Sequence, residues 1–309
     1  MHFSKPQMRE RTVGRWRRMQ MEEKAFRGIG GLLVCLFALA CAIPFLIVLS
    51  SSFSEEREII RHGYSLFPRG FTLDSYRAVL RQPGQIIRAY GVTVLVTAAG
   101  TAGSVFINTM TGYVLQRKDF EWRNRFSFYF FFTTLFSGGL VPWYILCVKY
   151  LHLSNNILAL ILPSLVSVWN LLLVKGFMAG IPFEITESGK IDGAGDFTIF
   201  IRLIIPLAKP VIATIGLFTA LLYWNDWYSC MLFISDEVRY NLQYLLYRMV
   251  GSAEAMRNIM AQTGADMDIV PIEAMKMTLT VIVTGPIVFL YPLIQKYFVK
   301  GLTIGAVKG

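Results

Sequence analysis

The chain has 309 residues, of which 54% are hydrophobic and 16% are charged, and its formal net charge is +10 at pH 7. Soluble domains are about 45–50% apolar and about 25% charged, so this composition excludes a soluble enzyme, a disordered regulator and a disulfide-rich secreted domain. In a soluble protein, an excess of Lys and Arg suggests that nucleic acid is a partner. In a membrane protein, the excess instead indicates which loops face the cytoplasm.

Six apolar runs are long enough to cross a hydrocarbon core of about 30 Å as helices. They predict an all-α membrane protein with six transmembrane helices, at residues 29–52, 89–113, 126–148, 156–177, 211–234 and 277–298. Residues 1–28 are expected to form a basic N-terminal arm, and residues 29–309 a transmembrane domain. Within the second run, the small residues 98–104 should let another helix approach closely.

The distribution of charge predicts the orientation of these helices. If the loops alternate between the two sides, the segments on the side of the N-terminus carry the whole net charge of +10, and the opposite side is balanced. By the positive-inside rule both termini are then cytoplasmic. The basic arm is expected to face anionic membrane lipids, and no nucleic acid is expected as a partner.

No pattern in the chain points to catalysis or to metal binding. The four cysteines lie in or beside apolar runs without CxxC spacing, and the three histidines are scattered. No GxxxxGK[ST] pattern occurs, so the chain lacks the loop that cradles a nucleotide phosphate. We therefore expect no catalytic residue, no metal site and no cofactor in this chain.

The predicted cytoplasmic segment 181–210 has the pattern of two short helices. Pro182 can begin the first, and Gly193 breaks it after Asp192. The second is predicted to start with Asp196 as its N-cap and to end at Pro206 and Pro210. One side of this second helix carries the apolar residues Phe197, Phe200, Ile201 and Ile204.

This segment resembles the EAA loop of ABC importer permeases. The family pattern begins Glu-Ala-Ala, and this chain has Glu187, Ser188 and Gly189 there, followed by the turn residues Asp192, Gly193 and Ala194 and then by Phe200 and Pro206. Gly189 is expected to loosen the first helix by about 0.5–1 kcal/mol relative to Ala. The resemblance implies a type I ABC importer transmembrane fold in a bacterial inner membrane.

The resemblance also implies partners. In that family the loop forms a coupling helix in a groove of the cytoplasmic ATPase, so we expect Glu187 to accept a hydrogen bond from an Arg or Lys of that subunit. The complete transporter would contain a second homologous permease, an ABC ATPase dimer that binds ATP and Mg, and an external solute-binding protein.

Further motifs are similar to the carbohydrate-uptake branch of these permeases. They are Ser51 to Ser54, Trp224 to Trp227, and the tail from Lys300 to Gly309, while Phe136 to Pro142 is most similar to the subgroup for complex and often acidic oligosaccharides. The resemblance implies an oligosaccharide substrate, possibly one derived from alginate or pectin.

A substrate pathway for sugars needs polar and aromatic groups inside the bundle. The fifth predicted span supplies the densest set, which comprises Tyr223, Trp224, Asn225, Asp226 and Trp227. Asn108 and Asn170 are secondary candidates. The alternative is that the tryptophans anchor the helix at the interface and that the asparagines bond neighbouring helices.

Two other functions stay open at the level of sequence. One is a membrane-embedded enzyme that acts on a lipid-linked sugar, with Asp226 and a loop carboxylate as acid and base. The other is an ion-driven secondary sugar transporter, which would need no ATPase subunit.

Overall fold

The computed structural model describes residues 6–81, 83–263 and 271–288. Helices are the only regular secondary structure in these residues, as the apolar runs predict. They form two compact units, which are described separately. The first comprises residues 6–78 and 271–281, and the second comprises residues 79–81, 83–263 and 282–288.

The first unit is built on one long helix, α1 (Pro6–Ser52), which has 47 residues. Its part from Phe26 to Ser52 is long and apolar enough to cross a membrane, so the first predicted span is helical throughout. Because α1 begins at Pro6, the described part of the basic arm continues the same helix. Two short helices, α2 (Glu56–His62) and α3 (Asp74–Val79), follow.

A buried carboxylate joins this unit to the last described helix, which covers residues 272–288. Glu56 accepts hydrogen bonds from the backbone N–H groups of Glu273 and Ala274, at 2.8 and 2.9 Å. These N–H groups lie in the first turn, where no helical carbonyl is available to them. Glu56 therefore caps the helix from outside its own segment.

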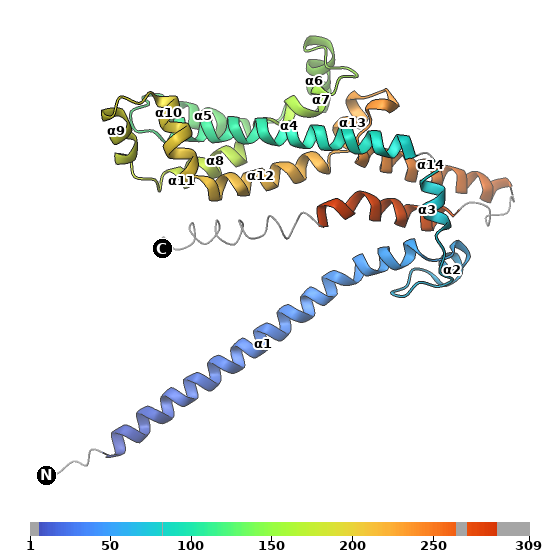
Figure 1. The fold of residues 1–309 in the computed structure, drawn as a ribbon, viewed down its shortest axis with the longest axis horizontal. Helices are drawn as coiled ribbons and strands as arrows, with labels where there is room; N and C mark the ends of the chain where they lie inside the picture. Colours follow the sequence, from blue (N-terminus) through green and yellow to red (C-terminus); the bar gives the residue numbers. More distant parts are fainter. Residues whose placement is uncertain (1–5, 82, 264–270, 289–309) are drawn as a thin grey trace. The chain divides into compact units, whose positions relative to one another are not determined.

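The second unit is organised around α4 (Pro83–Gln116), a 34-residue helix that contains the second predicted span. Figure 1 shows α4 lying along α12 (Lys209–Trp224), and α8 (Val168–Met178) packs on α4 as well. Further along the chain, the 3₁₀ turn Glu237–Arg239 leads into α14 (Leu242–Thr263). The N–H of Leu242 donates to Thr93 of α4 at 2.8 Å, which fixes where α14 begins.

Glycine permits the closest approaches to α4. A Cβ atom added at Gly100 would lie 2.5 Å from the ring of Tyr223 in α12, and one at Gly112 would lie 2.7 Å from Val174 in α8. Such distances are far inside van der Waals contact, so no larger side chain fits without displacing its neighbour. The run 98–104 thus does admit another helix, through Gly100.

Three predicted spans are interrupted in the structure. The helix predicted over 126–148 consists of α5 (Arg123–Thr133), α6 (Leu140–Ile145) and a π-helix (Leu146–Tyr150). The break precedes α6 at Gly139, whose φ of +83° lies in the left-handed region that glycine tolerates.

The span predicted over 156–177 consists of α7 (Leu158–Ile161), a 3₁₀ turn (Leu162–Ser164) and α8, with a bend of 46° before α8. The span predicted over 211–234 ends as a helix at Trp224 and resumes as α13 (Tyr228–Phe233). Apolar composition alone therefore overestimated the continuity of these helices.

By length and composition, two described helices can cross a membrane, or up to four if each bent pair is one span. The last predicted span, 277–298, is helical as far as residue 288, and its remainder lies outside the described residues. The number of six spans and the side of each terminus therefore stay predictions.

The contact between Gly100 and Tyr223 leads to a test of the α4–α12 interface. Gly100→Ala should destabilise the protein by about 1–3 kcal/mol, because the new methyl group must displace a packed ring. The measurement is denaturant unfolding of the purified protein in detergent. Gly91→Ala is the matched control on the same helix, since a Cβ there would have no neighbour within 4 Å. Equal unfolding midpoints for the two variants would contradict the packing argument.

Candidate functional site

The loop 181–210 begins with a short helix that ends in a glycine cap. Helix α9 covers Glu184–Ile191, two residues later than Pro182. Beyond it, Gly193 has a φ of +75°. The N–H of Gly193 donates to the carbonyl of Lys190, and the N–H of Ala194 donates to that of Gly189 at 2.9 Å. This pair of bonds is the Schellman motif, so the turn predicted at Asp192 and Gly193 is confirmed.

Helix α9 has an outward and an inward face. The outward face is exposed and consists of Glu184, Glu187, Ser188 and Ile191. Ile191 is 85% exposed, which is unusual for a large apolar side chain. Within the described residues, the Glu187 carboxylate has neither a hydrogen-bond partner nor an ion-pair partner. This face therefore offers one apolar side chain and one unpaired charge to a partner.

The inward face of α9 contains Thr186 and Gly189, both buried. A Cβ at Gly189 would lie 2.9 Å from Cγ1 of Ile199 and 3.0 Å from Cδ1 of Leu203. Glycine thus allows α9 to lie close against the next helix. The expectation that Gly189 merely loosens α9 omitted this contact, which favours glycine over alanine.

The second helix of the loop has three consecutive parts, α10 (Asp196–Ile199), a π-helix (Phe200–Ile204) and α11 (Ile205–Leu207). Its N-cap is Gly195, so the assignment of Asp196 as N-cap is wrong. Asp196 is the first helical residue, and its carboxylate bonds Arg117 instead. The exposed Pro206 lies in α11, and the chain then bends by 84° into α12.

The apolar side of this second helix is only partly as predicted. Phe200 and Ile204 are buried, but Phe197 is 61% exposed and Ile201 is also exposed. Ile199, the last residue of α10, is buried and joins Phe200 and Ile204 in the core. The cluster around Phe200 joins the loop to α4, α8 and α12, through Tyr113, Val174, Met178, Val211 and Ile215.

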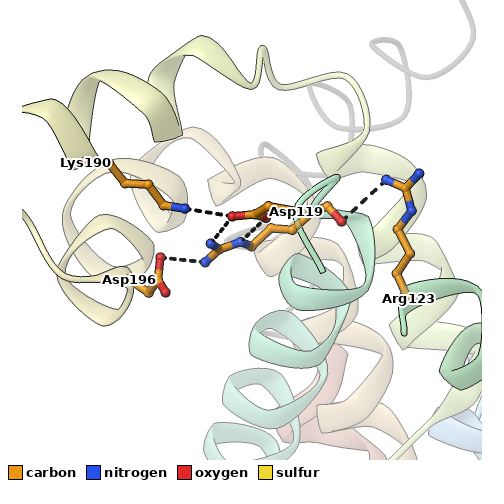
Figure 2. Close-up of polar contacts among 5 residues, drawn as sticks. Asp119, Arg123, Lys190 and Asp196 are labelled. Atoms are coloured by element: carbon orange, nitrogen blue, oxygen red, sulfur yellow. Dashed lines mark hydrogen bonds and ion pairs between the residues drawn. The ribbon is translucent and has the colours of Figure 1, made fainter. Parts of the chain in front are cut away.

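An ionic cluster fastens the loop to the C-terminal end of α4, and it consists of Arg117, Asp119, Lys190 and Asp196. Arg117 donates to Asp119 through Nε at 2.8 Å and through Nη2 at 2.5 Å, and its Nη1 donates to Asp196 at 2.7 Å. Lys190 donates to the same Asp119 at 2.7 Å. Figure 2 shows Lys190 and Asp196 meeting the cluster from the loop.

Arg123, the first residue of α5, also approaches this cluster, and its Nη1 donates to the backbone carbonyl of Arg117. Beside the cluster, an open hollow of about 370 Å³ is lined by Arg117, Asp119, Asp196 and the aromatic rings Tyr113, Phe120, Phe197 and Phe200. Sequence analysis did not single out Arg117, since nothing local in the sequence pairs it with Asp196.

The aromatic and polar residues predicted for the pathway have different positions. Tyr223 is buried and donates to the carbonyl of Ile161 at 2.8 Å, and Trp224 is buried with its Nε1 donating to the carbonyl of Val283. Asp226 accepts from the N–H of Ser229 at 2.9 Å and so caps α13. These three side chains all make contacts that support the fold.

Asn225 and Trp227 are exposed in the described structure. Asn225 accepts from Nε2 of Gln243 at 3.2 Å, and the ring of Trp227 stacks on Tyr247 at 4.6 Å between centroids. Both contacts lead to α14. Asn225 and Trp227 are therefore the pathway candidates whose surfaces remain available to a ligand.

The two secondary candidates lie at helix contacts. Asn108 donates to the carbonyls of Ser104 and Leu165 and accepts from the N–H of Ser167. Asn170 donates to Thr219 of α12 at 3.1 Å. Their role in a pathway stays a prediction, and the described structure gives each of them a partner within the chain.

Metal binding finds no support in the described part of the chain, where no three His, Cys, Asp or Glu side chains gather closely enough to hold an ion. The arrangement instead consists of a rigid pair of short helices that has an exposed outer face and a packed, ion-paired inner face. Such an arrangement can bind a partner protein on its outer face and hold that partner to the rest of the chain through its inner face. Its described side chains bring no nucleophile and base together.

Gly189 gives a test of how closely the loop helices pack. Gly189→Ala should lower stability by about 1 kcal/mol, because displacing Ile199 costs more than the improved helix propensity returns. Ser188→Ala, on the exposed side of the same turn, should raise stability by a few tenths of a kcal/mol, since propensity is the only change there. Unfolding in detergent measures both. A stabilising Gly189→Ala would show that this contact is not tight.

The chain is similar in sequence to known transport proteins. The polygalacturonan/rhamnogalacturonan transport system permease protein YtcP of Bacillus subtilis is 39% identical over 274 residues, covering 89% of this chain and 95% of that protein. Protein LplC of the same organism is 38% identical over 269 residues, covering 86% of this chain and 89% of that protein.

The fold is also similar to one in the crystal structure of a bacterial ABC transporter involved in the import of the acidic polysaccharide alginate. The TM-score is 0.77 and the identity 25%, over 90% of this chain and 98% of that one. Residues 108–304, which include the whole loop 181–210, match the family model described as binding-protein-dependent transport system inner membrane component. The chain therefore belongs to this family of transporter permeases.

Proposed function

We propose that this chain is the permease subunit that forms half of the translocation pathway of an oligosaccharide ABC importer, and that its loop 181–210 couples transport to a cytoplasmic ATPase. The outward face of α9 carries this proposal, because it exposes Ile191 and leaves Glu187 without a partner in the described residues. An apolar contact surrounded by charge is typical of a protein interface.

In this proposal the chain crosses the inner membrane six times, with both termini in the cytoplasm. The balanced charge of one set of loops and the net charge of +10 on the other support this orientation. Irregular backbone is tolerated at membrane depth only where protein covers it or water reaches it. The break before α6 is exposed in the described chain, so in this proposal another subunit covers it or it lies outside the hydrocarbon.

The proposed partners are a second homologous permease, an ABC ATPase dimer and an external solute-binding protein. ATP and Mg would bind only to the ATPase. ATP binding would close the ATPase dimer, draw the two coupling loops together and turn the cavity outward toward the docked binding protein. Hydrolysis would reverse these steps. A permease of this family is a transporter and not an enzyme, which removes the alternative of a lipid-linked-sugar enzyme.

The proposed cargo is an acidic oligosaccharide of the pectin or alginate type. Two similar proteins support it, since one belongs to a polygalacturonan/rhamnogalacturonan transport system and the other is involved in the import of alginate. On this chain, we propose that Asn225 and Trp227 contact the cargo, through an amide and a ring surface, respectively.

Loss of the Glu187 charge tests the coupling role. In proteoliposomes that contain the complete transporter, Glu187→Ala should lower cargo-stimulated ATP hydrolysis about tenfold, the effect expected for losing a charge-assisted hydrogen bond. Gly193→Asp should also lower it, because the backbone at Gly193 has a φ of +75°, which strains any residue with a Cβ atom and so distorts the turn that presents α9.

Glu121→Gln is the control for these variants, since it neutralises another exposed carboxylate in the loop before α5. Wild-type coupling in both Glu187→Ala and Gly193→Asp would refute the proposed role of the loop.

Removal of the Asn225 amide tests the pathway. Asn225→Ala should raise the concentration of an oligogalacturonate mixture needed for half-maximal uptake by about threefold to tenfold, the usual effect of one lost polar contact. Co-purification of the partner subunits should be unchanged, because the Asn225 side chain is exposed. Unaltered uptake kinetics would remove Asn225 from the pathway.

A further inference from the structure

The ionic cluster differs from an ordinary surface ion pair because its guanidinium is buried and fully paired. The Arg117 side chain is only 11% exposed, yet its Nε and both terminal nitrogens donate to carboxylates. Burying a guanidinium is costly unless its donors are satisfied. Arg117 therefore depends on Asp119 and Asp196 together, and Asp196 belongs to the loop.

The two helices of the loop are bound to the same pair of side chains. Lys190, in the last turn of α9, reaches Asp119, and Asp196, at the start of α10, reaches Arg117. The turn at Gly193 lies between them in the chain. A displacement of either loop helix is thus resisted at Arg117 and Asp119, which directly follow α4.

An aromatic contact supports the same connection. The Arg117 guanidinium lies 5.7 Å from the centre of the Tyr113 ring, one helical turn earlier in α4. Tyr113 in turn stacks on Phe200 of the loop, with ring centroids 5.5 Å apart. The end of α4 is therefore joined to the loop by both charge and packing.

The buried pair of the cluster, Arg117 and Asp119, stays ionised at physiological pH. The hydrogen bonds from Arg117 lower the pKa of Asp119 well below its usual range, and those from Asp119 raise the pKa of Arg117. A carboxyl group with a lowered pKa contributes stability above its unfolded-state pKa of about 3.9 and loses it only on acidification. The contribution of the Arg117–Asp119 pair to stability is thus constant from about pH 5 to pH 8.

We propose that Arg117 is a positioning residue for coupling, which holds α9 and α10 to the C-terminal end of α4 so that the loop and this helix move as one body. The inference rests on the proposed function, because it concerns how motion imposed on the loop reaches the membrane-spanning part. It adds residues outside the loop to the coupling apparatus.

The test removes the charge of both loop anchors and keeps an acceptor for buried Arg117. Asp196→Asn and Lys190→Gln change side chains that are 62% and 43% exposed, and the amide oxygen of Asn can still accept from Arg117, so the protein should fold while the ionic connection to the loop is lost. In the reconstituted transporter, the double variant should retain co-purification with the ATPase and basal ATP hydrolysis. Hydrolysis stimulated by the cognate binding protein with an oligogalacturonate mixture should fall about threefold or more per assembled complex.

A rescue variant distinguishes a positioning role of the cluster from a general effect on protein stability. Asp196→Glu restores a carboxylate and should recover most of the stimulated hydrolysis that Asp196→Asn loses, while Glu121→Gln should behave as wild type. Wild-type stimulation in the double variant would overturn the proposal. So would a loss of stimulation that only parallels a loss of assembled complex.

A comparison with Glu187→Ala shows which proposal fails. If Glu187→Ala uncouples the transporter and the double variant does not, only the positioning role of Arg117 is refuted. If Glu187→Ala and Gly193→Asp both couple normally, the proposed function of the loop itself is refuted.

Discussion

Helix α4 can lie against both α8 and α12 because glycine occupies the position of closest approach on each side. Gly100 faces the ring of Tyr223, and Gly112 faces Val174, at distances that exclude any Cβ atom. In an apolar environment, helices associate through such packing, since burial from water contributes little there. The other described contacts of the second unit depend on this arrangement, including the bond from Leu242 that places α14.

The same helix also positions the candidate coupling loop. At its C-terminal end, Tyr113 stacks on Phe200, and Arg117 directly after the helix bonds Asp196. The loop is therefore packed on its inner side, while its outer side presents Glu187 and Ile191. This asymmetry suits a segment that packs firmly on the membrane domain and binds a partner on its other side.

Sequence predicted features that depend on local chemistry. The helix predicted over 89–113 from its apolar length lies within α4. The turn at Gly193 and the close approach at the run 98–104 follow from left-handed backbone and from small side chains, respectively. The breaks near Gly139 and Asn225 were missed, because the apolar residues on both sides were taken as one run, although the glycines at 138 and 139 and the polar pair Asn225 and Asp226 interrupt it. Apolar composition reports burial in membrane or protein and does not report whether the backbone stays helical.

Contacts between distant segments escaped prediction for a different reason. Arg117 and Asp196 are separated by 79 positions, and each looks alone like an ordinary surface charge. Asp196 next to a glycine was a reasonable N-cap, but the nearby guanidinium competes for its carboxylate. From helix propensity alone, Gly189 is expected to destabilise α9, but its close contact with Ile199 requires a residue without a side chain.

The central claim is that the outer face of α9 binds the ATPase. Hydrogen exchange of the backbone amides, measured on the assembled permease pair with and without its ATPase, tests this claim most directly. Peptides covering residues 184–199 should exchange more slowly when the ATPase is bound, while the exchange rates of peptides from the α4–α12 interface should not change. Unchanged exchange over 184–199 in a complex that has demonstrably formed would contradict it.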